Sequence, residues 1–271
     1  MLKKRIFTAL VLIPLVLAIL FFMPPTLFCL LTGLIVLAAA WEWSHLMEIK
    51  TFSRRILYVV LVLFMAFYML FLPAPLILFA AFIWWLLATL LVLIYPRAAI
   101  VWGQGVFVRG CMGLFVLLPC WVAINFIRNQ GDGVYTLLFL FVLIWSADSA
   151  AYFVGKKWGT KKLAAEVSPG KSWQGVAGGV LFSMLLVLLM LWVCAVPVNM
   201  WLLAILLSFV TVLFSIVGDL FESMLKRRAG VKDSGGLLPG HGGLLDRIDS
   251  LTAAAPVFAF GMIVLNGLWN G

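Results

Sequence analysis

Long, uncharged apolar runs constrain this chain more than any other feature. Leu-, Val- and Phe-rich stretches follow one another along the sequence, and only 11% of the residues are charged. A soluble domain carries about 25% charged residues, whereas a helix of about 20 apolar residues can cross a bilayer. The runs are continuous and do not alternate with polar residues, which excludes a transmembrane barrel. The sequence therefore predicts an all-α, polytopic integral membrane protein and excludes a soluble enzyme.

Hydropathy predicts nine transmembrane helices. Tight breaks at Pro24-Pro25, Pro73-Ala74-Pro75 and Pro197-Val198-Asn199 separate paired spans, because proline does not continue a helix. We expect the first span to remain uncleaved, since the bulky segment 21–25 offers no small-residue cleavage site. The predicted spans run approximately over residues 6–23, 26–41, 56–72, 75–95, 106–127, 135–154, 176–196, 200–221 and 250–268.

The placement of basic residues predicts the orientation. Of the 19 Lys and Arg residues, all but Arg128 fall in one set of alternate connecting segments. Cytoplasmic segments of membrane proteins are enriched in Lys and Arg, so we expect a cytoplasmic N-terminus, an external C-terminus and multi-pass insertion in the cell (inner) membrane. Membrane topology accounts for the formal charge of +9, and we expect no nucleic-acid partner.

Polar residues gather in the second half of the chain. Residues 1–140 hold only three of the ten acidic residues, and we expect this part to be a transmembrane scaffold. Residues 141–271 hold the other acids and are predicted to form the catalytic region, with cytoplasmic loops at 155–175 and 222–248. The active site is expected to face the cytoplasm.

Two features of the catalytic region come before residue 175. Asp148 falls inside the sixth predicted span. Inserting an ionisable group there costs at least ~2.5 kcal/mol, so its presence indicates a functional role. The alternative is a structural carboxylate that is hydrogen-bonded to a neighbouring helix. Further on, Ser168-Pro169-Gly170-Lys171-Ser172 places small residues around one lysine where a new helix opens. Such a segment can present backbone N–H groups and a cation to a phosphate, although it lacks the spacing of a Walker A loop.

Carboxylates surround the next loop. Their spacing puts Asp219, Glu222, Ser223 and Lys226 on one face of the eighth predicted helix. Glycines at 235–243 let the backbone approach a ligand closely.

Asp246 and Asp249 lie three residues apart at the start of the ninth predicted helix. Hard oxygen ligands suit magnesium, which bridges substrate phosphates. We therefore predict that Asp219, Asp246 and Asp249 form one magnesium site, with Asp148 nearby. For Asp246 alone, a helix cap is an equally good interpretation.

The segment from Ser223 to Asp249 resembles the signature of the phosphatidate cytidylyltransferase (CDP-diacylglycerol synthase) family. The matching elements are Ser223, Lys226-Arg227, Lys232-Asp233, His241-Gly242-Gly243, Asp246-Arg247 and Asp249. The segments 148–152 and 168–172 also resemble the family, so the likeness covers roughly residues 145–255. This chain departs from many members at two places. It has Gly170-Lys171-Ser172 where they have Lys-Lys-Thr, and Gln174 where they have Glu.

The resemblance implies that CTP and phosphatidate react to give CDP-diacylglycerol and pyrophosphate, with Mg²⁺ as cofactor. It is compatible with a second, monovalent cation and with a homodimer in the lipid bilayer. The catalytic residues that it implies are Asp148, Asp219, Lys226, Lys232, Asp233, His241, Asp246, Arg247 and Asp249. The substrate-binding residues are Ser168, Lys171, Ser172, Ser223, Arg227, Gly242 and Gly243.

Two other functions compete with this one. A CTP-dependent polyprenol or lipid kinase would release CDP and would need a base for its hydroxyl nucleophile. A transporter would gather its ionisable groups near the bilayer midplane on discontinuous helices, whereas here the charges gather at one face. The fate of labelled CTP separates the three, since a transporter yields neither pyrophosphate nor CDP.

Overall fold

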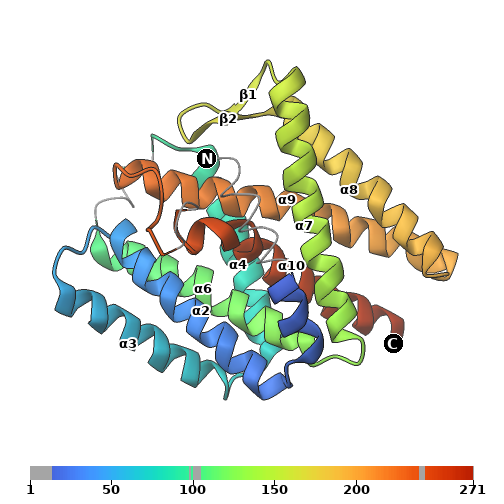
Figure 1. The fold of residues 1–271 in the computed structure, drawn as a ribbon, viewed down its shortest axis with the longest axis horizontal. Helices are drawn as coiled ribbons and strands as arrows, with labels where there is room; N and C mark the ends of the chain where they lie inside the picture. Colours follow the sequence, from blue (N-terminus) through green and yellow to red (C-terminus); the bar gives the residue numbers. More distant parts are fainter. Residues whose placement is uncertain (1–13, 98, 100–104, 238–241, 271) are drawn as a thin grey trace.

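The computed structural model describes residues 14–97, 99, 105–237 and 242–270 (Figure 1). Helices dominate it, and eight of those described are long and apolar enough to cross a membrane. They are α2 (Pro25–Leu46), α3 (Phe52–Met69), α4 (Ala74–Leu93), α6 (Val106–Arg128), α7 (Gly133–Trp158), α8 (Trp173–Val193), α9 (Val198–Arg228) and α10 (Leu245–Asn270). The all-α class and the multi-pass architecture predicted from sequence are confirmed.

The described helices correspond to the second to ninth predicted spans. Residues 14–22 of the first predicted span are also helical, and the rest of that span lies largely outside the described residues. Several helices run further than predicted, because α2 continues to Leu46, α7 to Trp158 and α9 to Arg228. The predicted loop 222–248 is therefore shorter, because residues 222–228 belong to α9, in agreement with the helical spacing of Asp219, Ser223 and Lys226, and residues 245–248 belong to α10.

The length of α9 exceeds the thickness of the hydrocarbon layer. Its 31 residues span about 46 Å at the rise of an α-helix, compared with a hydrocarbon core of about 30 Å. Lys226, Arg227 and Arg228 end the helix, and cations there interact favourably with the C-terminal end of the helix dipole.

A small β-hairpin corrects the prediction that 155–175 is a loop. Strands β1 (Lys162–Ala164) and β2 (Ser168–Ser172) pair in antiparallel fashion, with Lys162 opposite Ser172 and Ala164 opposite Ser168. The segment 168–172 is thus a strand, and α8 begins immediately after it. Ser172 caps α8 by accepting a hydrogen bond from the Gly175 N–H at 3.2 Å.

Gln174 secures the start of the hairpin. Its Oε1 accepts hydrogen bonds from the N–H groups of Thr160 and Lys161, both at 3.2 Å, and its Nε2 donates to Thr160 Oγ1 at 2.7 Å. These contacts give the amide side chain a positioning role in the turn between α7 and β1.

Packing brings α9 and α10 into the centre of the molecule. Helices α7 and α8 pack together, as do α9 and α10, and α10 also contacts α6 and α4. Phe221 of α9 is buried and meets the rings of Trp84 and Trp85 edge-on, at centroid distances of 5.9 and 5.8 Å. Aromatic pairs of this kind fix the C-terminal half of α9 against α4. Figure 1 shows the hairpin at one end of the α7–α8 pair, and α9 crossing towards α2 and α6.

Candidate active site

The site begins at a close contact between α9 and α10. A Cβ atom at Gly218 would lie 2.5 Å from the carbonyl oxygen of Asp249 and 3.0 Å from the Ala253 Cβ. Only a residue without a side chain fits this contact, so Gly218 allows the two helices to approach at the level of the adjoining Asp219 and Asp249.

Lys171 joins the hairpin to this point. Its Nζ lies 2.6 Å from Asp219 Oδ2, and both side chains are partly exposed. Ser223, one turn further along α9, donates its hydroxyl to Asp219 Oδ1 at 3.3 Å. The strand β2 therefore delivers a lysine to the predicted carboxylate face of α9.

Asp148 and Asp249 complete a group that we call the aspartate–lysine cluster: Asp148, Lys171, Asp219 and Asp249. Ser250 connects α7 with α10, because its N–H donates to Asp249 Oδ1 at 2.8 Å and its hydroxyl to Asp148 Oδ2 at 3.4 Å. Asp148 and Asp249 each lie within electrostatic reach of Asp219 and Lys171. Like charges gathered in this way repel one another unless a cation compensates them, and Lys171 supplies one positive charge.

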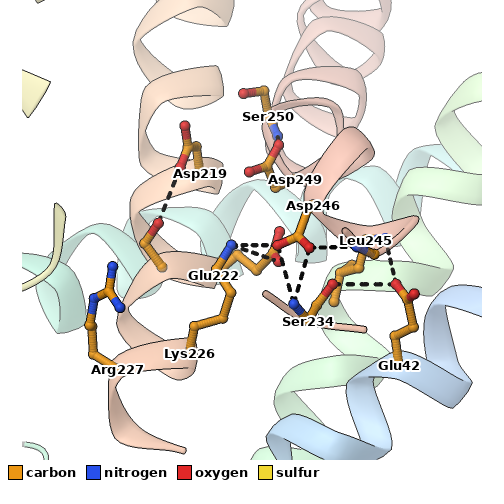
Figure 2. A network of polar contacts seen from close by, with 12 residues as sticks. Glu42, Asp219, Glu222, Lys226, Arg227, Ser234, Leu245, Asp246, Asp249 and Ser250 are labelled. Atoms are coloured by element: carbon orange, nitrogen blue, oxygen red, sulfur yellow. Dashed lines mark hydrogen bonds and ion pairs between the residues drawn. The ribbon is translucent and has the colours of Figure 1, made fainter. Parts of the chain in front are cut away.

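A second polar network lies further along α9. The buried Lys226 places Nζ 2.6 Å from Asp246 Oδ1 and 3.2 Å from Glu222 Oε1. The carboxylate of Glu222 is buried, and the Lys226 ammonium compensates its charge. Figure 2 shows Asp246 in contact with both Lys226 and the loop that carries Ser234. Lys226 thus ties α9 to the first turn of α10.

Asp246 also organises the loop before α10. Its Oδ2 accepts the Ser234 N–H at 3.0 Å and the Gly243 N–H at 2.8 Å. Gly242 precedes this contact with a φ of 85°, a conformation that glycine adopts without steric cost. In this structure Asp246 therefore satisfies loop N–H groups and an ammonium, as an N-terminal capping side chain does.

Glu42 is a site residue that sequence analysis missed, since we assigned residues 1–140 to the scaffold. It is 1% exposed on α2, and its Oε2 accepts the Leu245 N–H at 2.8 Å and the Ser234 hydroxyl at 3.3 Å. A Cβ atom at Gly235 or Gly243 would lie 2.4 or 2.6 Å from a carboxylate oxygen of Glu42. Its sequence signal is a lone carboxylate in an apolar helix, the same signal that drew attention to Asp148.

Among the remaining predicted residues, Arg227 has a structural contact. Arg227 donates from Nε to the Val167 carbonyl at 3.2 Å and so holds the hairpin turn against the end of α9. Lys232, Asp233 and Arg247 are exposed. Ser168 lies on β2, and His241 falls outside the described residues.

The predicted magnesium ligands Asp219, Asp246 and Asp249 differ in how their carboxylates are engaged. Within the described ranges, no three His, Cys, Asp or Glu side chains converge closely enough to hold a metal ion. The carboxylates of Asp219 and Asp249 offer the hard oxygens that magnesium prefers. Asp246 differs, because Lys226 and two N–H groups already contact its oxygens.

Comparison with known proteins assigns nearly the full length of the chain to one protein family. A model of the cytidylyltransferase family matches residues 3–265. A phosphatidate cytidylyltransferase of Pseudomonas aeruginosa is 47% identical over 261 residues, which cover 96% of each chain. One of Haemophilus influenzae is 38% identical over 286 residues, covering 96% of this chain and 98% of that protein. A third, of Bacillus subtilis, is 39% identical over 181 residues, 65% of each chain.

Proposed function

The chain belongs to the cytidylyltransferase family, and from that premise we propose that it is a phosphatidate cytidylyltransferase, which converts CTP and phosphatidate into CDP-diacylglycerol and pyrophosphate. It is a nucleotidyltransferase of phospholipid biosynthesis. The observation that carries the proposal is full-length similarity to proteins of that name, 47% and 38% identical. The aspartate–lysine cluster supplies a place for the chemistry.

The reaction makes one bond and breaks one. An oxygen of the phosphatidate phosphate attacks the α-phosphorus of CTP, and the bond from that phosphorus to the bridging oxygen of the β-phosphate breaks. The leaving pyrophosphate carries the negative charge away. A phosphate monoester has its second pKa near 6, so the nucleophile is already largely dianionic and needs no general base. The protein must position the two phosphates and stabilise the charge on pyrophosphate.

We propose that the hairpin and the end of α9 bind the phosphates of CTP. Lys171 is partly exposed and already contacts Asp219, so it can turn from the carboxylate to a phosphate without moving the strand. Ser168 and Ser172 flank it on β2. The exposed cations Lys232 and Arg247 add positive charge on the loop side, and Arg227 holds the hairpin beside them.

The acids proposed to hold magnesium are Asp219, Asp246 and Asp249, with Asp148 nearby. Magnesium, when bound, would neutralise the triphosphate and favour attack at the α-phosphorus. Asp219 and Asp249 can turn carboxylate oxygens towards it, whereas Asp246 would first release Lys226 or a backbone N–H. Asp246 also keeps Lys226 and the glycine-rich loop in place beside the cluster.

The proposal also covers the location of the protein and the side of the membrane on which its active site lies. We place the protein in the inner membrane with its active site towards the cytoplasm, because the basic residues gather in one set of connecting segments. The homodimer and the second, monovalent cation stay predictions.

One assay tests the proposed function. The purified protein in detergent would receive phosphatidate and CTP labelled in the γ-phosphate, with and without a chelator. We expect labelled pyrophosphate and unlabelled CDP-diacylglycerol, and loss of both with the chelator. Label transferred to the lipid, with release of CDP, would instead identify a kinase. Turnover that survives the chelator would remove magnesium from the proposal.

A further inference from the structure

A groove lies between α3 and α6, and none of the residues of the aspartate–lysine cluster lines it. It has a volume of about 770 Å³, with residues 47–51, which connect α2 to α3, at one end. None of its lining residues belongs to the catalytic or substrate-binding residues predicted from sequence. Volumes of 300–1,000 Å³ are typical of ligand sites, so the groove is large enough to hold part of an organic molecule.

The walls of the groove are apolar along most of its length. Leu57 and Leu61 of α3 and Phe107 and Leu114 of α6 line it. Leu57 is 67% exposed and Phe107 82% exposed, so much of this apolar surface is uncovered within the described structure. Helix α3 lies at the edge of the molecule (Figure 1), where the hydrocarbon of a bilayer would meet the groove.

One end of the groove carries positive charge. Lys50 and Arg54 both line it, both are exposed, and neither forms an ion pair with a described residue. The neighbouring Arg55 differs, because its guanidinium donates to the Ile49 carbonyl and contacts His45. Arg54 and Lys50 are therefore the cations at this end that are available to a ligand.

The acidic residue at this end does not cancel that charge. Glu48 is paired with the buried Arg109, which also donates to the Leu46 carbonyl at 3.2 Å. The hydrogen bond from Arg109 is the largest cause that holds the pKa of Glu48 below its ordinary value, and attraction to Arg228 and Lys50 adds less, so Glu48 is compensated chiefly by Arg109.

The first turn of α3 opens towards the same end. Thr51 precedes the helix and makes no side-chain capping bond, and it lines the groove together with Lys50 and Arg54. Backbone N–H groups at the start of a helix attract anions. Two cations and an uncapped helix start thus stand at one end of an apolar groove.

We propose that this groove binds an anionic phospholipid of the bilayer, with one acyl chain between α3 and α6 and the phosphate against Lys50, Arg54 and the first turn of α3. A soluble phosphate would use the charged end but not the apolar walls. A zwitterionic lipid would use the walls but would bring a positive group to the two cations. The site is separate from the reaction and does not depend on the proposed activity.

Native mass spectrometry of the full-length protein tests this site with phosphatidylglycerol. Its phosphate is a diester and cannot serve as the phosphatidate substrate, so its binding reports on the groove. In Lys50→Gln/Arg54→Gln, we expect the affinity for the first phosphatidylglycerol to fall on the order of 30-fold, as expected for two juxtamembrane charges. Leu61→Trp would fill the groove from an exposed position and should also displace the lipid.

A matched control removes the same charge elsewhere. Arg97→Gln/Lys162→Gln changes two exposed cations away from the groove and should retain wild-type affinity. Equal loss in both double variants would mean diffuse attraction and would overturn the site. Phosphatidylcholine binding as tightly as phosphatidylglycerol would also overturn it, as would full affinity in Leu61→Trp. Thermal melts of each variant verify that it is folded.

Discussion

Glu42 on α2 accepts a hydrogen bond from the backbone N–H of Leu245 at 2.8 Å, although 203 residues separate them in the chain. The same carboxylate oxygen accepts the Ser234 hydroxyl, so one side chain ties Ser234 of the preceding loop to the first residue of α10 (Figure 2). The loop that carries Gly242 and Gly243 therefore owes its position to a helix of the first half of the chain.

Replacing Glu42 by alanine should loosen this loop. The Leu245 N–H and the Ser234 hydroxyl would be left without an acceptor, and each buried donor left unsatisfied costs about 1–3 kcal/mol. We expect a lower melting temperature and reduced turnover in Glu42→Ala. Glu42→Gln retains one acceptor oxygen and should be much milder in both measurements. Equal effects of the two variants would contradict a hydrogen-bonding role.

Gly218→Ala should separate α9 from α10. The added methyl group would lie 2.5 Å from the Asp249 carbonyl oxygen, so the helices must shift. A displacement of about 1 Å at reacting groups can cost on the order of 100-fold in rate, and we expect such a loss of kcat. Gly267→Ala, also in a helix but with nothing within 4 Å, is the matched control and should leave kcat unchanged.

Asp219→Asn and Asp249→Asn test the proposed magnesium ligands. Each change keeps the shape of the side chain and removes its charge, so turnover should fall on the order of 100-fold or more while the protein stays folded. Partial recovery at higher magnesium concentration would support direct ligation. Near-normal turnover in either variant would remove that residue from the metal site.

Asp246→Asn should behave differently from those two variants. The change leaves the buried Lys226 without its closest carboxylate, at 2.6 Å, and breaking a buried ion pair costs about 3–5 kcal/mol. We therefore expect a marked fall in melting temperature together with the loss of activity. Wild-type stability with abolished turnover would instead identify Asp246 chiefly as a metal ligand.

Lys171→Ala should weaken the use of CTP. Removing one contact to a charged phosphate raises KM for CTP on the order of 10-fold, whereas Lys157→Ala should change it little. Lys157 is exposed and packs over the Trp158 ring at 4.6 Å from its centroid, away from the aspartates. The same rise in both variants would indicate a diffuse basic patch and contradict a specific role for Lys171.

Local patterns in the sequence predict much of this architecture. Apolar runs bounded by proline give the helices, and helical spacing puts Asp219, Ser223 and Lys226 on α9, where the structure has them. Such inferences work because the period of a helix is fixed by backbone geometry.

Contacts between distant segments could not be predicted in this way. Nothing near Glu42 in the sequence points to Ser234 or Leu245, and hydropathy cannot show that α2 ends beside their loop. The hairpin at 162–172 is too short and too polar for its strand periodicity to be recognised. The pairing of Asp246 with Lys226, in turn, depends on how α9 and α10 are packed.

The excess length of α9 affects how the reaction should be measured. A helix of 31 residues is about a third longer than the hydrocarbon layer is thick, so we expect Ser223 and Lys226, near its C-terminal end, to lie at the depth of the lipid headgroups. Phosphatidate reaches that depth by lateral diffusion in two dimensions, while CTP arrives from water in three. The rate should therefore follow the surface mole fraction of phosphatidate, and diluting the lipid with inert detergent should slow turnover even when its bulk concentration is held constant.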